Sequence, residues 1–175
     1  MNKAVFLDRD GVLNEERGTY TWRLEDFKIC NGVPDSLQRL KSAGYFLLVV
    51  TNQAGISRGI YTIKDMIACH EFLRAETGGV IDHIYYAVCH PEFSRSLMRK
   101  PDSLMFEKGL AKYQIDPAIS WMVGNSERDM IPAMKLNINT IFTGRGPKEL
   151  PVNFYAEDLI SATEYILRNP PGTNR

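Results

Sequence analysis

The sequence has no excess of charge of either sign and few cysteines. Lys and Arg number 21, as do Asp and Glu, so no overall field attracts nucleic acid or an anionic membrane. The cysteines are Cys30, Cys69 and Cys89, an odd number without Cys-x-x-Cys spacing. This pattern argues against a disulfide framework and indicates a reduced, intracellular chain.

Long apolar runs are absent as well. No run approaches the length of a membrane span, and the apolar segment at residues 4–7 is far too short for a secretion signal. We therefore expect a cytoplasmic protein without membrane contact. The 175 residues suffice for one domain with its own core. We expect this domain over residues 1–168 and a frayed tail over 169–175, which is rich in Pro, Gly and Asn.

Short apolar segments alternate with segments of helical spacing along the chain. The apolar runs predict buried strands over 4–7, 46–50, 81–88, 121–123 and 139–142. The helical segments begin at 33, at 63 after an N-cap at Thr62, at 104, at 130 and at 156. In the second helix we expect Ile63, Met66, Ile67 and either His70 or Leu73 on the buried face. The pattern predicts a Rossmann-like, doubly wound α/β fold with a mostly parallel sheet of five or six strands and no inserted cap domain.

The first strand ends in a pair of carboxylates, Asp8 and Asp10, followed by Gly11. Ligands bind at the carboxyl end of strands in an open α/β sheet. Two carboxylates this close repel each other unless a cation or a proton intervenes, and Mg²⁺ prefers hard oxygen ligands. Taken alone, the motif is also compatible with a turn in which both Asp side chains merely cap the loop.

Three further segments place polar residues beside strand ends or helix starts. Thr51 and Asn52 follow the second strand, where hydroxyl, amide and backbone N–H groups can hold phosphate oxygens. Arg99 and Lys100 precede the third helix and can neutralise phosphate charge. Asn125 and Asp129 follow the fourth strand and can complete a metal site. Each segment alone has a plain structural explanation, as a turn residue or a solvated charge.

In this order, the four segments resemble the motifs of haloacid-dehalogenase-type phosphatases over residues 5–143. The resemblance implies that Asp8 is the nucleophile, that Asp10 is the general acid and base, and that its carbonyl meets Mg²⁺. It also implies that Thr51 and Lys100 bind phosphate.

Within that family, residues 8–14, 51–59 and 99–101 resemble the D-glycero-D-manno-heptose-1,7-bisphosphate phosphatases, capless relatives of the histidinol-phosphate phosphatases. This closer resemblance implies removal of the 7-phosphate from a small phosphorylated sugar by an Mg²⁺-dependent monomer. Histidinol phosphate remains the second substrate. The implied residues are Asn52 for phosphate, Arg58 and Arg99 for substrate, and Asp8, Asp10, Asn125 and Asp129 for the metal.

Two departures from those relatives stand out. Ala87, Cys89, Ser96 and Met98 occupy the positions of their zinc-binding Cys-x-His and Cys-x-Cys pairs. One thiol cannot build a tetrahedral zinc site, so we expect no structural zinc and a loop over 91–98 that is either packed or mobile.

The second departure is Asn125, which stands where the family pattern has a metal-binding Asp. An amide oxygen brings no charge, so we expect weaker Mg²⁺ binding. Alternatively, Asn125 only caps the next helix. A noncatalytic phosphosugar-binding protein therefore remains open. The balanced charge argues against a nucleic-acid end phosphatase.

Overall fold

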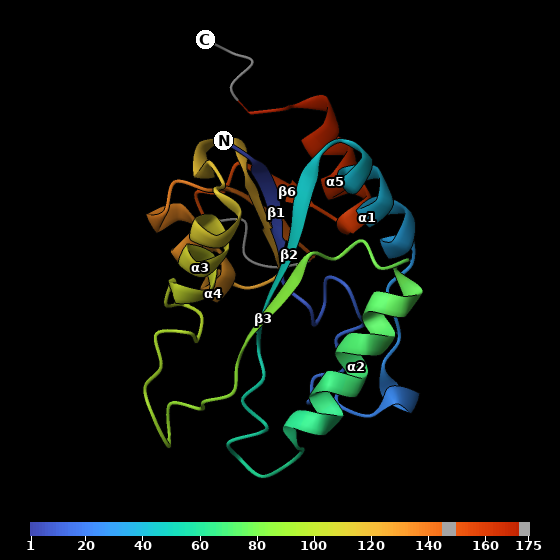
Figure 1. The fold of residues 1–175 in the computed structure, drawn as a ribbon, viewed down its shortest axis with the longest axis vertical. Coiled ribbons are helices and arrows are strands. Elements are labelled where there is room, and N and C mark those ends of the chain that lie inside the picture. The colour runs from blue at the N-terminus through green and yellow to red at the C-terminus, as the bar shows by residue number, and fades with distance from the viewer. Residues whose placement is uncertain (145–149, 172–175) are drawn as a thin grey trace.

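The computed structural model describes residues 1–144 and 150–171, which form a parallel sheet between two layers of helices (Figure 1). Two short 3₁₀ helices, Leu24–Asp26 and Pro117–Ile119, lie in the connections. The strands are β1 Lys3–Leu7, β2 Tyr45–Asn52, β3 His83–Ala87, β4 Trp121–Gly124, β5 Asn139–Thr143 and β6 Phe154–Ala156. The helices are α1 Val33–Ser42, α2 Ile63–Glu76, α3 Leu104–Tyr113, α4 Glu127–Lys135 and α5 Leu159–Arg168.

The sheet has the order β3-β2-β1-β4-β5-β6, and every neighbouring pair is parallel. This confirms the predicted doubly wound α/β fold. The strand order reverses between β1 and β4, and the carboxyl ends of two such strands border the crevice in which open α/β sheets bind ligands. The site is therefore expected where β1 and β4 end.

The strands are apolar on both faces because helices cover both. Alternate residues of β1 enter different cores: Val5 and Leu7 pack with α1, α2 and α5, whereas Ala4 and Phe6 pack with α3 and α4. In Figure 1, α1 and α5 lie on one side of the sheet and α3 and α4 on the other. Burial on both faces explains the continuous apolar runs in the sequence.

Two helix boundaries differ from the prediction, and one strand was not predicted. Residues 154–156 form the edge strand β6, and α5 begins only at Leu159, because Asp158 caps it by accepting a hydrogen bond from the Ser161 amide at 2.8 Å. Helix α4 begins at Glu127, three residues before the predicted start at 130. Of the predicted tail, residues 172–175 lie outside the described residues.

Helix α2 confirms its predicted cap but not its predicted buried face. The Thr62 hydroxyl accepts a hydrogen bond from the Asp65 amide at 3.2 Å. Ile63 and Ile67 are 47% and 45% exposed, so placing them in the core was wrong. The buried stripe instead follows the i, i+3, i+4, i+7 spacing through Met66, Cys69, His70 and Leu73.

The segments that cross the carboxyl edge of the sheet carry no inserted domain in the described structure. The connection from β1 to α1 contains only a short 3₁₀ helix, and the connection from β3 to α3 is a loop. Both run over the strand ends. None of the described helices has the length and apolar character needed to cross a membrane.

Candidate active site

The turn after β1 fixes Asp8 and Asp10 at the crevice. The Asp8 amide donates to the Val123 carbonyl of β4 at 3.0 Å, and the Arg9 carbonyl accepts from the Leu13 amide at 2.8 Å. Gly11 has φ +80°, and a Cβ there would collide with the amide nitrogen of Asn125. The turn therefore requires glycine for its conformation and for this close approach.

Lys100 is buried, 1% exposed, and its ammonium group joins three parts of the fold. Its Nζ lies 2.8 Å from Asp8 Oδ1 and 2.7 Å from Asp129 Oδ1, and donates to the Val50 carbonyl of β2 at 2.7 Å. Two of these contacts are hydrogen bonds, to Asp8 and to the Val50 carbonyl, and the contact with Asp129 Oδ1 is an ion pair. Lys100 was predicted to bind phosphate; in this structure its charge is paired with Asp8 and Asp129.

Asp8 is unusually easy to protonate for a carboxyl group. Burial, and next the negative charge of Asp129, raise its pKa to about 7, against the opposing effect of Lys100. Burial disfavours the charged form of Lys100, but Asp129 and Asp8 outweigh it and raise the lysine pKa. The ammonium group therefore stays charged while Asp8 titrates near neutrality. Asp8 Oδ1 also accepts from the Arg9 amide at 2.8 Å, a bond between neighbouring residues.

Asp129 is fully buried, and both its oxygens are engaged. Oδ1 faces Lys100, and Oδ2 accepts from the Ser126 amide at 3.0 Å. A Cβ at Gly124 would lie 2.6 Å from Cβ of Asp129, so only glycine fits at the end of β4. Ser126, not Asn125, is the N-cap residue of α4. The capping alternative for Asn125 is therefore wrong, and its amide nitrogen donates instead to the Asp10 carbonyl at 3.2 Å.

Arg9 is a functional residue that the sequence did not reveal. It is 1% exposed, and its Nη2 donates to both Asp10 oxygens, at 2.7 and 2.9 Å, and to the Thr21 carbonyl at 2.9 Å. Asn14 donates a further hydrogen bond to Asp10 Oδ1 at 3.0 Å. The Asp10 carboxylate is thus held by a buried, planar cation. Only the position of Arg9 between two Asp residues could have indicated this.

The residues at the carboxyl end of β2 make hydrogen bonds mainly within the protein. The Asn52 side chain bonds the Lys100 backbone twice, donating to its carbonyl and accepting from its amide, both at 3.1 Å. The Thr51 hydroxyl lies 2.9 Å from the Gln53 amide, which also meets the Tyr61 hydroxyl at 2.8 Å. Thr51 is 1% exposed. Of the predicted phosphate-binding residues, Asn52 positions the Lys100 backbone, whereas Thr51 contacts Gln53.

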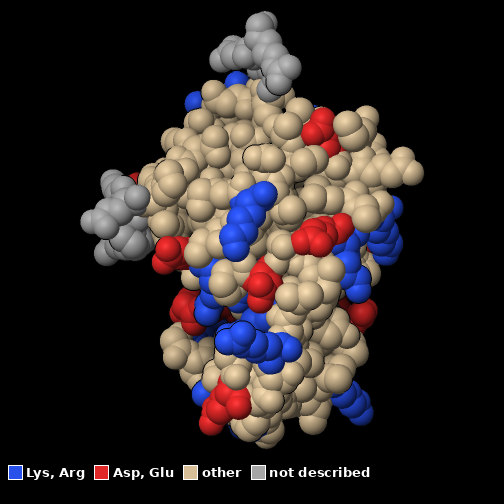
Figure 2. Space-filling model, turned by 90° about the vertical axis from the view of Figure 1, so that its left-hand side faces the viewer, with Lys and Arg blue, Asp and Glu red and all other residues tan. Residues whose placement is uncertain are grey.

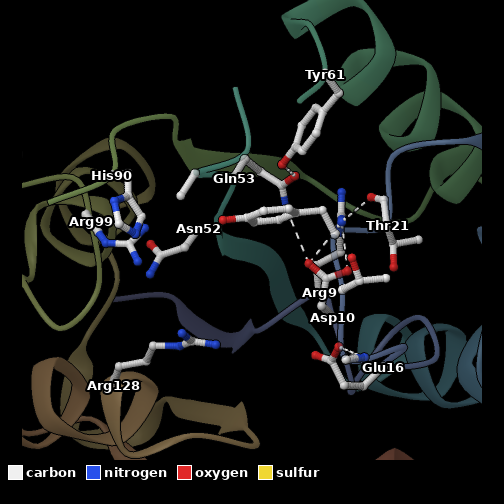
Figure 3. Close-up of a pocket in the computed structure, with 14 residues that line it drawn as sticks. Arg9, Asp10, Glu16, Thr21, Asn52, Gln53, Tyr61, His90, Arg99 and Arg128 are labelled. Carbon is white, nitrogen blue, oxygen red and sulfur yellow. Dashed lines mark hydrogen bonds and ion pairs between the residues drawn. The ribbon is translucent and has the colours of Figure 1, made fainter. Parts of the chain in front are cut away.

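A pocket of about 550 Å³ opens beside these groups (Figure 3). Of the predicted residues, Asp10, Asn52 and Arg99 line it. Arg58 does not; it is exposed and lies 3.5 Å from Glu92. Asn125 lines a neighbouring pocket with Gly11. The lining residues that the sequence did not single out are Arg9, Glu16, Gly18, Thr19, Tyr20, Thr21, Gln53, Ala54, Tyr61, His90 and Arg128.

The loop over residues 91–98 is held by hydrogen bonds at its two ends. The His90 amide donates to the Ser57 hydroxyl at 2.9 Å, and Arg99 Nη1 donates to the Cys89 carbonyl at 3.3 Å. Phe93 and Leu97 are 60% and 67% exposed, so their packing contributes little. In the described part of the chain, no three His, Cys, Asp or Glu side chains are grouped so that they could hold a metal.

Comparison with known proteins identifies the family. The model of the haloacid dehalogenase-like hydrolases matches residues 8–143. The chain belongs to this family.

Several relatives carry one enzyme name. The D-glycero-beta-D-manno-heptose-1,7-bisphosphate 7-phosphatases of Helicobacter pylori and Yersinia pestis are 37% and 38% identical, over 86% and 95% of this chain and 88% and 90% of theirs. The solved D,D-heptose 1,7-bisphosphate phosphatase of B. bronchiseptica, complexed with magnesium and phosphate, has a TM-score of 0.88 and 26% identity, covering 95% of this chain and 99% of that one.

The contact between His70 and buried Arg9 predicts how folding stability depends on pH. Its Nε2 lies 3.5 Å from Arg9 Nη1, and because guanidinium only donates, the ring must be neutral there. Burial, and next the charge of Arg9, lower the His70 pKa to about 3. The unfolded chain therefore binds the extra proton below about pH 6.5, so folding stability is lost as the pH falls toward 3.

We expect this titration to contribute about 1.4 kcal/mol per pH unit to the fall in unfolding free energy below about pH 6.5. His70→Gln, which keeps an acceptor, should remove that contribution. The less buried His83→Gln should change the slope less. Urea unfolding between about pH 7 and pH 5 measures the slopes. Parallel curves for the wild type and His70→Gln would show that His70 is not held neutral.

Proposed function

We propose that this chain is an Mg²⁺-dependent phosphatase that removes the 7-phosphate of D-glycero-D-manno-heptose 1,7-bisphosphate through an aspartyl-phosphate. The observation that carries the proposal is the buried Asp8 carboxylate, with Oδ1 held by Lys100 at 2.8 Å and Oδ2 without a donor among the described residues. One oxygen is fixed, and the other is left to react. The substrate comes from the names of the relatives.

The chemistry divides between the two carboxylates of the turn. Asp8 Oδ2 attacks phosphorus, and the bond from phosphorus to the sugar oxygen breaks. Asp10 gives its proton to that leaving oxygen. Water then attacks the aspartyl-phosphate, Asp10 takes a proton from the water, and inorganic phosphate leaves with Asp8 restored. Arg9 and Asn14 orient the Asp10 carboxylate for both transfers.

The donor set of this chain fits Mg²⁺. Asp8 supplies a carboxylate and Asp10 its backbone carbonyl, and the Asn125 amide lies at that carbonyl. Its nitrogen and oxygen are distinguished only by their hydrogen bonds, so turning the amide over presents its oxygen as a third hard ligand. The buried charges of Asp8, Asp129 and Lys100 sum to one negative charge, which favours a cation. When bound, Mg²⁺ would stabilise the charge on the transferred phosphoryl group.

The structure gives Asp129 a different part in this proposal from the one the sequence indicated. Both its oxygens are engaged by Lys100 and the Ser126 amide. We therefore place it as the residue that holds Lys100 charged and in position. The ligand set then contains a single carboxylate, Asp8, in keeping with the weak Mg²⁺ binding expected from Asn125.

The charge pattern of the surface is consistent with a small substrate. On the face shown in Figure 2, acidic side chains lie among the basic ones, unlike the continuous basic groove that a nucleic-acid polymer requires. The three cysteines are unpaired, which supports the proposed cytoplasmic location. We also propose one domain over residues 1–168 and a monomer.

Asp8→Asn tests the nucleophile. It preserves shape but removes the attacking charge, so kcat should fall at least about a thousandfold on any accepted phosphate ester. Asp35→Asn, the same change at an exposed position in α1, should leave kcat unchanged. The assay compares heptose 1,7-bisphosphate, its monophosphate and histidinol phosphate. Substantial activity in Asp8→Asn would refute the mechanism, and a larger kcat/KM for histidinol phosphate would refute the substrate.

Asn125→Asp tests the metal site. The added carboxylate faces the Asp10 carbonyl and lies near Asp8, so it should destabilise the metal-free protein and strengthen Mg²⁺ binding. We expect a lower Tm without Mg²⁺, a larger rise in Tm on adding Mg²⁺, and half-maximal activity at a lower Mg²⁺ concentration. Titrations at fixed ionic strength measure all three. If the curves of both proteins superimpose, Asn125 does not belong to the metal site.

A further inference from the structure

We propose that Arg128, together with Arg99, forms the subsite for the phosphate that stays on the sugar, and thereby selects bisphosphates over monophosphates. The proposal rests on the proposed function, because it assumes a bisphosphorylated substrate. The sequence assigned no role to Arg128, which lies in the first turn of α4, between Asn125 and Asp129 of the fourth motif segment.

The two guanidinium groups converge on the same pocket from different elements. Arg99 comes from the loop before α3, and Arg128 from α4; both line the pocket of about 550 Å³. In Figure 3, Arg99 lies on one side of the pocket beside Asn52, and Arg128 extends into it from below. Arg9 and Asp10 occupy the opposite side. The pocket is therefore asymmetric in charge.

Arg99 and Arg128 are the positive charges of this pocket without a carboxylate partner. Arg9 is neutralised by Asp10 at 2.7 Å. Among the described residues, the Arg99 side chain donates only to the Cys89 carbonyl, and the Arg128 side chain forms no ion pair or hydrogen bond. Burial, and next the charge of Arg128, lower the pKa of Arg99. Two cations close enough to repel each other, facing a shared space, are stabilised by a dianion between them.

The transferred phosphate does not account for these two side chains. It must reach Asp8, whose charge is already matched by buried Lys100, and Arg9 occupies the side of the pocket where Asp10 meets the leaving oxygen. A second phosphate on the same sugar would lie away from Asp8, and guanidinium binds phosphate through two parallel hydrogen bonds. Arg58 is a weaker choice for this role because Glu92 pairs with it outside the pocket.

The test compares Arg128→Gln with Lys135→Gln, which removes the same charge from the exposed far end of α4. Both proteins are assayed with heptose 1,7-bisphosphate and with p-nitrophenyl phosphate, which has one phosphate. We expect Arg128→Gln to lower kcat/KM for the bisphosphate about tenfold or more, mainly through KM, and to change that for p-nitrophenyl phosphate less than about twofold. Lys135→Gln should change neither, and Arg128→Lys should recover part of the loss.

Binding to the Asp8→Asn background separates the subsite from turnover. Calorimetry should show Arg128→Gln weakening the bisphosphate about tenfold and inorganic phosphate hardly at all. Two results of the kinetic assay would overturn the role of Arg128: in Arg128→Gln, an equal loss of kcat/KM for heptose 1,7-bisphosphate and p-nitrophenyl phosphate, or a loss no larger than that of Lys135→Gln. Either result would leave the proposed phosphatase activity intact. If the wild type hydrolyses p-nitrophenyl phosphate but neither binds nor hydrolyses the bisphosphate, the substrate assignment fails, and the subsite with it.

Discussion

The ammonium group of Lys100, buried between Asp8 and Asp129, is the interaction on which the site depends. It connects the end of β1, the carbonyl of Val50 in β2 and the first turn of α4. Removing one partner of such a buried pair leaves an uncompensated charge and typically costs about 3 to 5 kcal/mol. The sequence therefore has little freedom at these positions, and Asp8, the proposed nucleophile, is held in place before any substrate arrives.

Around this centre, each charged group has a partner that limits what it can do. Asp10 is held by Arg9, and Arg9 in turn contacts the Thr21 carbonyl and neutral His70. Asn52 secures the backbone of Lys100 instead of offering its amide to the pocket. The groups left without a partner are then the informative ones. Among the described residues, Oδ2 of Asp8 has no donor, and the guanidinium groups of Arg99 and Arg128 have no carboxylate partner.

Much of the fold was predictable because burial on both faces of a parallel sheet leaves uninterrupted apolar runs. Strand β6 was not, since three residues beside a helix are too short to show a period. Asp8, Asp10 and Lys100 could be found because their motifs follow strands or precede a helix. Arg9, His70 and Arg128 could not, because no local pattern distinguishes a buried or pocket-facing charge from a solvated one. Their roles depend on contacts between distant segments, such as Arg9 with His70.

The comparison with relatives and the geometry support each other at different levels. The family follows from residues 8–143, and the proposed substrate comes from the names of proteins that are 37% and 38% identical. The geometry adds what the names do not contain: a buried lysine in contact with two aspartates and a backbone carbonyl, and an amide where the family pattern has a carboxylate.

The most direct test of the account is to trap the phosphorylated enzyme. Labelled substrate is mixed with excess wild-type protein, the reaction is quenched in acid within a single turnover, and the label is located by peptide mass spectrometry. The account predicts a phosphoryl group on the peptide that contains Asp8, and little of it in Lys100→Met, in which Asp8 faces Asp129 without a cation. Turnover with no label on Asp8, or equal labelling in Lys100→Met, would contradict the central place of this buried ion pair.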